Sequence, residues 1–277
     1  MLVRLLGPVD VRAADGPRPV SGIRRKAILA TLALHGPEPV STGRLLEAAW
    51  GTGVPRAGVV TLRSHLSHLR DVLGRRLAIT ACPPGYRLDL PGDGTDVRRA
   101  ERLLREAGQA ADPRTRVRLL TAAQGLWRGD SLADVTGLAW LEAQAERLDT
   151  LHLQVRRRLA EARLAAGEHT ALTGDLLLLT AEYPLDEGLC ALLMTALYRS
   201  GQQAAALAAY RRLRCLLGDE LGLGPSQPLR DLELAILRQD PALTAPSRPV
   251  ACAGPVQYSR RSRSCTSGRV RPGQPSG

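Results

Sequence analysis

Phenylalanine is absent from this 277-residue sequence, and tryptophan and tyrosine together supply only 3% of it. Apolar residues nevertheless reach 44%, and most of them are leucine and alanine. Because both are good helix formers, this composition favours helices that pack through aliphatic side chains. The length suits two domains better than one.

Long apolar segments are also missing. The sequence has no run of about 18 consecutive uncharged apolar residues, which a membrane-spanning helix would need. Residues 1–8 lack the basic stretch and apolar core of a signal peptide. We therefore expect a cytoplasmic protein with no membrane partner.

Cysteine pairs and catalytic motifs are missing as well. The odd number of cysteines argues against a disulfide framework, and without CxxC spacing or nearby histidines they do not indicate a zinc site. There is no GxxxxGK[ST] phosphate loop and no convincing Ser/His/Asp arrangement. We expect neither an enzyme nor a cofactor or metal site. The cysteines are Cys82, Cys190, Cys215, Cys252 and Cys265.

The net charge of +11 is unevenly distributed. Residues 1–95 contain 13 basic and 7 acidic residues, residues 96–243 contain 19 and 20, and residues 244–277 contain 6 and none. A basic first region beside a nearly neutral second one indicates a polyanionic partner, and double-stranded DNA is the favoured candidate.

Residues 1–92 read as short strands, three helices and a final hairpin. Period-2 patterns and turn residues predict the strands, and helical periodicity predicts the helices. Ser41 and Thr42 are suitable N-caps for the second helix. This order is typical of a winged helix-turn-helix DNA-binding domain. The expected strands are 2–6, 9–12, one near Val20, 77–80 and 86–90, and the expected helices are 21–34, 42–50 and 57–73.

The third helix, 57–73, carries the functional prediction. An apolar stripe is expected to face the core, which leaves Val60, Ser64, Ser67 and Asp71 on the outer face. Short serine side chains let a helix backbone approach the major groove, where donors can read base edges. The stripe consists of Val59, Leu62, Leu66, Leu69 and Leu73.

The predicted DNA contacts divide between this helix and the hairpin around Pro83-Pro84-Gly85. Arg63 and His68 are expected to reach bases, whereas His65 and Arg70 lie on the shoulders, near phosphates. Arg87 either reaches a phosphate or simply lies on the surface. The complete predicted set is Thr61, Arg63, Ser64, His65, Ser67, His68, Arg70, Arg75, Arg76 and Arg87.

Residues 96–240 read as nearly continuous helix with an internal repeat. Gly167 precedes Gly201 by 34 residues, the tetratricopeptide period, and both glycines lie between two helices. Ala206 and Tyr210 match the small and aromatic packing positions of that repeat. The expected helices are 97–110, 115–126, 138–166, 170–182, 186–200, 203–217 and 228–239. Residues 241–277, rich in Pro, Ser, Gly and Arg, are expected to form a disordered basic tail that either holds DNA nonspecifically or is dispensable.

Several segments resemble a known family. Four segments resemble the DNA-binding half of the Streptomyces antibiotic regulatory proteins, which has the winged fold of OmpR-type effectors. They are MLVRLLGP at 1–8, LLEAAWG at 45–51, TLRSHLSHLR at 61–70 and PPGYRL at 83–88. Four later segments resemble the bacterial transcriptional activation domain, a tetratricopeptide-like helical module. They are LWRG at 126–129, LLMTALYRSG at 192–201, AAALAAYRRL at 204–213 and DELGLGP at 219–225.

The resemblance implies an activator of a secondary-metabolite gene cluster, such as an antibiotic pathway. It would bind direct repeats near the promoter as a homodimer on DNA and recruit RNA polymerase holoenzyme. Since no phosphate loop follows the second half, we expect a small, nucleotide-independent member.

Three residues depart from the family pattern. His68 stands where the family usually has arginine, and Arg63 where it often has glutamine, so the base sequence read by the family is not transferable. Gly174 is expected to interrupt a helix and to loosen it by about 1 kcal/mol relative to alanine.

An alternative remains open, because a polar outer face also describes most surface helices. In it, the chain is a helical-repeat interaction protein whose first domain binds DNA weakly or nonspecifically. Affinity that depends on duplex sequence distinguishes the two hypotheses.

Overall fold

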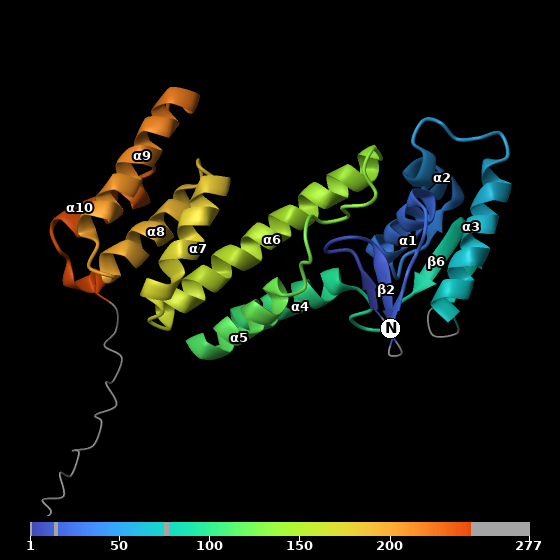
Figure 1. The fold of residues 1–277 in the computed structure, drawn as a ribbon, viewed down its shortest axis with the longest axis horizontal. Helices are drawn as coiled ribbons and strands as arrows, with labels where there is room; N and C mark the ends of the chain where they lie inside the picture. Colours follow the sequence, from blue (N-terminus) through green and yellow to red (C-terminus); the bar gives the residue numbers. More distant parts are fainter. Residues whose placement is uncertain (1, 14–15, 75–77, 245–277) are drawn as a thin grey trace, which may run out of the picture. The chain divides into compact units, whose positions relative to one another are not determined.

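The computed structural model describes residues 2–13, 16–74 and 78–244. Within them the fold is mainly helical, with ten α-helices and six short strands (Figure 1). Arg75 and Arg76, and the predicted tail beyond residue 244, lie outside the described residues.

The first ninety residues follow the order expected from the sequence. Three antiparallel strands, β1 (Leu2–Arg4), β2 (Asp10–Ala13) and β3 (Gly16–Arg18), form one sheet. Three helices follow, and a second sheet has the strand order β4-β6-β5. The helices are α1 (Ile23–His35), α2 (Thr42–Trp50) and α3 (Gly58–Leu73), and the strands are β4 (Val40–Ser41), β5 (Ala78–Cys82) and β6 (Gly85–Asp89).

Strand β4 was not predicted, and it explains why Gly85 follows the two prolines. Val40 pairs with Tyr86, and Ser41 pairs with Gly85. A Cβ atom on Gly85 would lie 2.1 Å from the carbonyl oxygen of Val40, so no larger residue fits this backbone approach. The hairpin β5–β6 is thereby fixed against the start of α2, where the Ser41 hydroxyl accepts a hydrogen bond from the Arg44 N–H at 3.2 Å.

The rest of the described chain is helical, and consecutive helices pack side by side (Figure 1). The observed boundaries follow the predicted ones closely, except that α9 continues to Leu221. The helices are α4 (Asp96–Gln109), α5 (Pro113–Gln124), α6 (Ala139–Ala165), α7 (His169–Glu182), α8 (Glu187–Arg199), α9 (Gln203–Leu221) and α10 (Gln227–Leu237). None of those in the described part of the chain is long and apolar enough to cross a membrane.

The predicted 34-residue repeat corresponds to two turns with the same backbone geometry. Gly167 and Gly201 have φ angles of +80° and +77°, the left-handed region that glycine adopts most easily. The residue after each glycine donates its N–H to a carbonyl five positions back, from Glu168 to Arg163 and from Gln202 to Leu197, at 2.9 Å in both cases. These bonds are typical of a glycine-ended helix.

One expectation about the helical region was wrong. Gly174 does not interrupt a helix, because α7 runs unbroken through it. Leu172, Leu176 and Leu179 bury one face of α7 and hold the helix together. Of the predicted tail the structure describes only the part up to residue 244, which contains a 3₁₀ turn, Pro241–Leu243, whose Leu243 carbonyl accepts a hydrogen bond from Arg199 Nε at 2.9 Å.

The largest core joins the first sheet and helices to the helical region. Leucines of α1, α2 and α3 share one cluster with Val97, Leu132, Leu141 and Leu148. At its edge the Trp140 ring of α6 stacks on His35 of α1, with 5.1 Å between ring centroids. The two regions predicted as separate domains therefore pack on a common apolar interior.

Candidate nucleic-acid interface

Helix α3 has one buried face and one exposed face. Leu62, Leu66, Leu69 and Leu73 are all buried, as the stripe predicted. Val59 was wrongly included in that stripe, because its side chain is 43% exposed. Gly58 is the buried residue in the first turn of α3 instead. A Cβ there would lie 2.9 Å from Val54 Cγ1 and 3.3 Å from Leu46 Cδ2, so glycine allows this close approach.

The outer face of α3 carries five polar side chains, one of which, Asp71, is acidic. Arg63, Ser64, Ser67, His68 and Asp71 are exposed and, within the described residues, form no hydrogen bond or ion pair. Val60, beside them, is 69% exposed. This face, called the outer α3 face below, therefore offers basic and hydroxyl groups, one carboxylate and one apolar side chain to a partner.

His65 and Thr61 belong to the structure of α3 as well as to its surface. The His65 ring is half-buried and lies 5.7 Å from the Trp50 ring, measured between centroids. Burial, and then the charges of Arg25 and Arg24, lower the pKa of His65 and so favour its neutral form. The Thr61 hydroxyl donates to the Ala57 carbonyl at 3.1 Å.

Arg70 and Arg87 form interactions within the protein. Arg70 Nε donates to the Ile79 carbonyl at 2.9 Å and so ties the last turns of α3 to strand β5. Arg87 Nε lies 2.7 Å from Asp89 Oδ1, and both side chains are about two-fifths exposed, at 43% and 41%. Such a surface ion pair contributes little to stability and is easily exchanged for another anion.

Sequence reasoning missed two arginines at the start of α1. The Arg24 guanidinium lies 5.3 Å from the centroid of the Trp50 ring, a cation–π distance. Arg24 and Arg25 are close enough to His65 for their charges to lower its pKa. They therefore add positive charge beside the outer α3 face. The signal that could have found them is the run Arg24-Arg25-Lys26 at a predicted helix start.

Lys26, the third basic residue of that run, points elsewhere. Its ammonium group forms an ion pair with Asp134, whose other carboxylate oxygen accepts the Val9 N–H at 2.9 Å. Only Arg24 and Arg25 of the run therefore remain beside α3. Within the described residues no group of three His, Cys, Asp or Glu side chains could hold a metal ion.

The comparisons with known proteins agree on one family. The family model described as "Bacterial transcriptional activator domain" matches residues 95–237. Regulatory protein DnrI of Streptomyces peucetius is 34% identical over 271 residues, which cover 91% of this chain and 98% of DnrI. Transcriptional regulatory protein EmbR of Mycobacterium tuberculosis (strain H37Rv) is 35% identical over 260 residues, which cover 91% of this chain and 67% of EmbR.

A solved structure shows the same fold. Mycobacterium tuberculosis EmbR in complex with a low affinity phosphopeptide superposes with a TM-score of 0.82 at 33% identity, over 89% of this chain and 66% of that chain. The chain thus spans about two thirds of EmbR and nearly all of DnrI. On these grounds the chain belongs to the Streptomyces antibiotic regulatory protein family of transcriptional activators, which carry the bacterial transcriptional activator domain.

Proposed function

We propose that the chain is a sequence-specific DNA-binding activator that inserts α3 into the major groove. The observation that carries this proposal is the outer α3 face. Its arginine, histidine and serines have no partner within the described part of the chain, while four buried leucines hold the helix rigidly from behind. Arg63 and His68 can donate to guanine or adenine edges, and Val60 can contact a thymine methyl group.

Residues 1–92 act in this proposal as an OmpR-type winged helix-turn-helix domain. The order of strands, three helices and a closing hairpin supports the assignment, since the hairpin β5–β6 is the expected wing. Arg70 holds the wing to α3 through Ile79. Arg87 on β6 is then placed to exchange Asp89 for a DNA phosphate, and we propose the same phosphate role for Arg75 and Arg76.

Phosphate contacts would also come from the start of α1. Arg24 and Arg25 lie beside His65 and add two positive charges to the surface that faces the duplex. Contacts of this kind set the affinity and the salt dependence, whereas the outer α3 face sets the sequence preference.

Residues 96–240 act as a tetratricopeptide-like activation domain. The matching glycine turns at Gly167 and Gly201 support that relation. In this proposal the domain contacts RNA polymerase holoenzyme and a second protomer, so that a homodimer on DNA occupies a direct repeat near a promoter. DnrI and the other relatives are named as regulators, and by analogy the target is a secondary-metabolite gene cluster. Residues 241–277 would add nonspecific affinity.

The test is a gel-shift titration of the full chain on duplexes tiled across neighbouring promoters, with random duplex as competitor, at two salt concentrations. The proposal expects at least one fragment to bind about 10³-fold more tightly than random duplex, within the usual range for specific regulators. Equal binding to every duplex, disappearing at the higher salt, would overturn the proposal and favour a helical-repeat interaction protein.

A further inference from the structure

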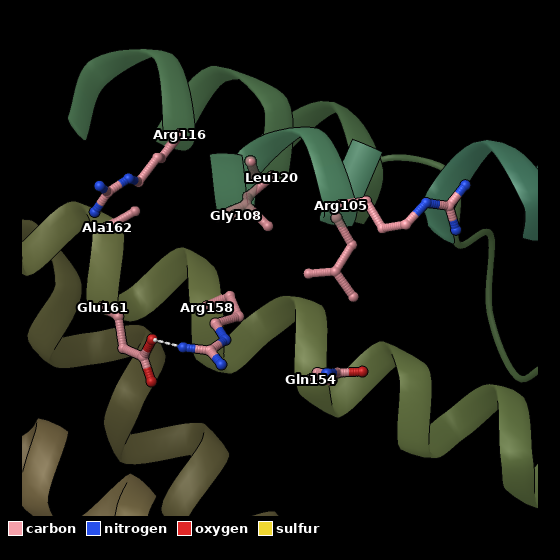
Figure 2. A pocket seen from close by; sticks show the side chains of 10 residues that line it. Arg105, Gly108, Arg116, Leu120, Gln154, Arg158, Glu161 and Ala162 are labelled. Atoms are coloured by element: carbon pink, nitrogen blue, oxygen red, sulfur yellow. Dashed lines mark hydrogen bonds and ion pairs between the residues drawn. The ribbon is translucent and has the colours of Figure 1, made fainter. Parts of the chain in front are cut away.

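The helical region contains a groove that the proposed DNA and polymerase contacts do not use. It has a volume of about 520 Å³ and is lined by residues of α4, α5 and α6. Pockets of 300–1,000 Å³ are the usual size for small organic ligands. Figure 2 shows α4 and α5 on one side of the groove and α6 on the other.

The floor of the groove is apolar because small residues meet where the helices face one another. Ala107 of α4 and Ala162 of α6 share a small core cluster with Leu120 of α5. This cluster is separate from the main core. At Gly108 a Cβ atom would meet nothing within 4 Å, so the wall of the groove stays open there. The helices therefore leave unfilled a volume that larger side chains could occupy.

The rim of the groove is mostly cationic. Arg105, Arg116 and Arg158 line it, with Glu161 as its one acidic residue. Arg158 and Glu161 form an exposed i,i+3 pair at 2.9 Å on α6 (Figure 2). Pairs of this kind are weak and leave the remaining guanidinium donors available.

Arg116 is held in place at one end of the groove. Its Nε donates to the Ala110 carbonyl at 2.7 Å, at the C-terminal end of α4. Figure 2 shows the Arg116 side chain reaching from α5 toward Ala162, and its Nη2 donates to the Ala111 carbonyl at 3.4 Å. The charge of Arg116 therefore lies next to the apolar floor without a carboxylate partner among the described residues.

We propose that this groove binds a small organic anion with an apolar body, such as an aromatic or aliphatic carboxylate or sulfonate. The apolar floor would take the body, and Arg116 and Arg158 would take the charged group. The volume, the separate apolar cluster and the cationic rim all fit one ligand of this class. Because α4 and α6 also pack against the first ninety residues, a bound ligand would lie between two helices that contact the DNA-binding region.

The test uses two probes with similar bodies and different charge. 1-Anilinonaphthalene-8-sulfonate is anionic, and N-phenyl-1-naphthylamine is its uncharged analogue. Fluorescence titration of the full chain is expected to give saturable 1:1 binding of the sulfonate. Gly108→Leu places a large side chain in the groove. Because leucine is a better helix former than glycine and the position is exposed, we expect the fold to be kept. The affinity for the sulfonate should fall at least about tenfold. Gly218→Leu makes the same change on α9, outside the groove, and is expected to leave affinity unchanged.

The charge requirement is tested separately. Arg116→Met and Arg158→Met keep most of the aliphatic stem and are expected to weaken sulfonate binding about tenfold, the usual size for a lost charged hydrogen bond, without changing binding of the uncharged analogue. Arg118→Met, an exposed arginine of α5 that does not line the groove, is the matched control. Three outcomes would overturn the proposal: absence of saturable binding, equal binding by Gly108→Leu and wild type, or equal losses for the two probes.

Discussion

The carboxylate of Asp96 accepts the backbone N–H of Leu5 through both oxygens, at 2.8 and 2.9 Å, across 91 positions of the sequence. It also accepts the Leu6 N–H at 3.0 Å, and the Leu6 carbonyl in turn accepts the Arg128 N–H at 2.9 Å. The first residue of α4 therefore completes the hydrogen bonding of the chain just after β1. A fragment that stops at residue 95 lacks this partner, so tests of DNA binding require the full chain.

Asp96 also predicts a pH dependence of stability. The side chain is 1% exposed, and burial raises its pKa from 3.8 to about 6, although the Leu5 and Leu6 N–H groups and Arg128 act in the opposite direction. A raised carboxyl pKa means that the folded state binds the proton more tightly, so its contribution to stability is present below pH 4 and is lost as pH rises through 6. Relative to Asp96→Asn, the wild type should gain about 2 kcal/mol of unfolding free energy between pH 7 and pH 4.

Urea denaturation of the full-length wild type and Asp96→Asn at several pH values measures the difference between their unfolding free energies. Other carboxylates titrate equally in both proteins and cancel in the comparison. A difference that stays constant from pH 7 to pH 4 would mean that Asp96 has an ordinary pKa in the folded protein.

Two glycines should respond oppositely to the same substitution. Gly174 lies inside α7 with open space around it, so Gly174→Ala should stabilise the protein by about 1 kcal/mol. Gly167 has equally open space but a φ of +80°, so Gly167→Ala should destabilise by about 1 kcal/mol. Chemical denaturation of both variants checks the signs. Stabilisation by Gly167→Ala would contradict the assigned turn geometry.

Alanine substitutions of Arg63 and Arg70 should affect different properties, DNA binding in the first case and protein stability in the second. Arg63 is on the outer α3 face, so Arg63→Ala should leave the melting temperature unchanged and cost about 1–3 kcal/mol in binding a specific duplex. Arg70 donates to Ile79, so Arg70→Ala should lower the unfolding free energy by about 1 kcal/mol. Thermal melts and gel shifts of both variants provide the comparison, and a loss of stability in Arg63→Ala would place that side chain within the protein structure.

Arg24 and Arg25 should contribute affinity without sequence preference. If each neutralises one phosphate, Arg24→Ala and Arg25→Ala should each reduce the slope of log affinity against log salt by about 0.9. The loss should be equal on specific and random duplexes, and the matched control Arg118→Ala should keep the wild-type slope. A loss confined to the specific duplex would assign base contacts to these arginines instead.

Local patterns predicted most of the secondary structure, but they could not predict contacts between distant segments. The leucine spacing of α3 was sufficient to identify its buried face, because periodicity is a property of neighbouring residues. Strand β4 has only two residues, and it exists because Val40 pairs with Tyr86 far along the chain. Its sequence alone carries no comparable signal.

The same limit applies to the candidate site. The sequence placed Val60, Ser64, Ser67 and Asp71 on one exposed face, with Arg63 and His68 beside it, because these residues share a helix. The nearness of Arg24 and Arg25 to α3, and the contact of Arg70 with β5, depend on how helices and strands pack. The bonds from Asp96 to Leu5 and Leu6 likewise join residues that no local pattern connects.

The most direct test of the central claim is dimethyl sulfate protection of guanine N7 on a bound promoter fragment, compared between wild type and Arg63→Ala. N7 faces the major groove, so insertion of α3 should protect guanines in two patches about one helical turn apart, one for each protomer. Arg63→Ala should lose protection at one position in each patch. Unprotected N7 atoms on a specifically bound duplex would contradict entry of α3 into the major groove.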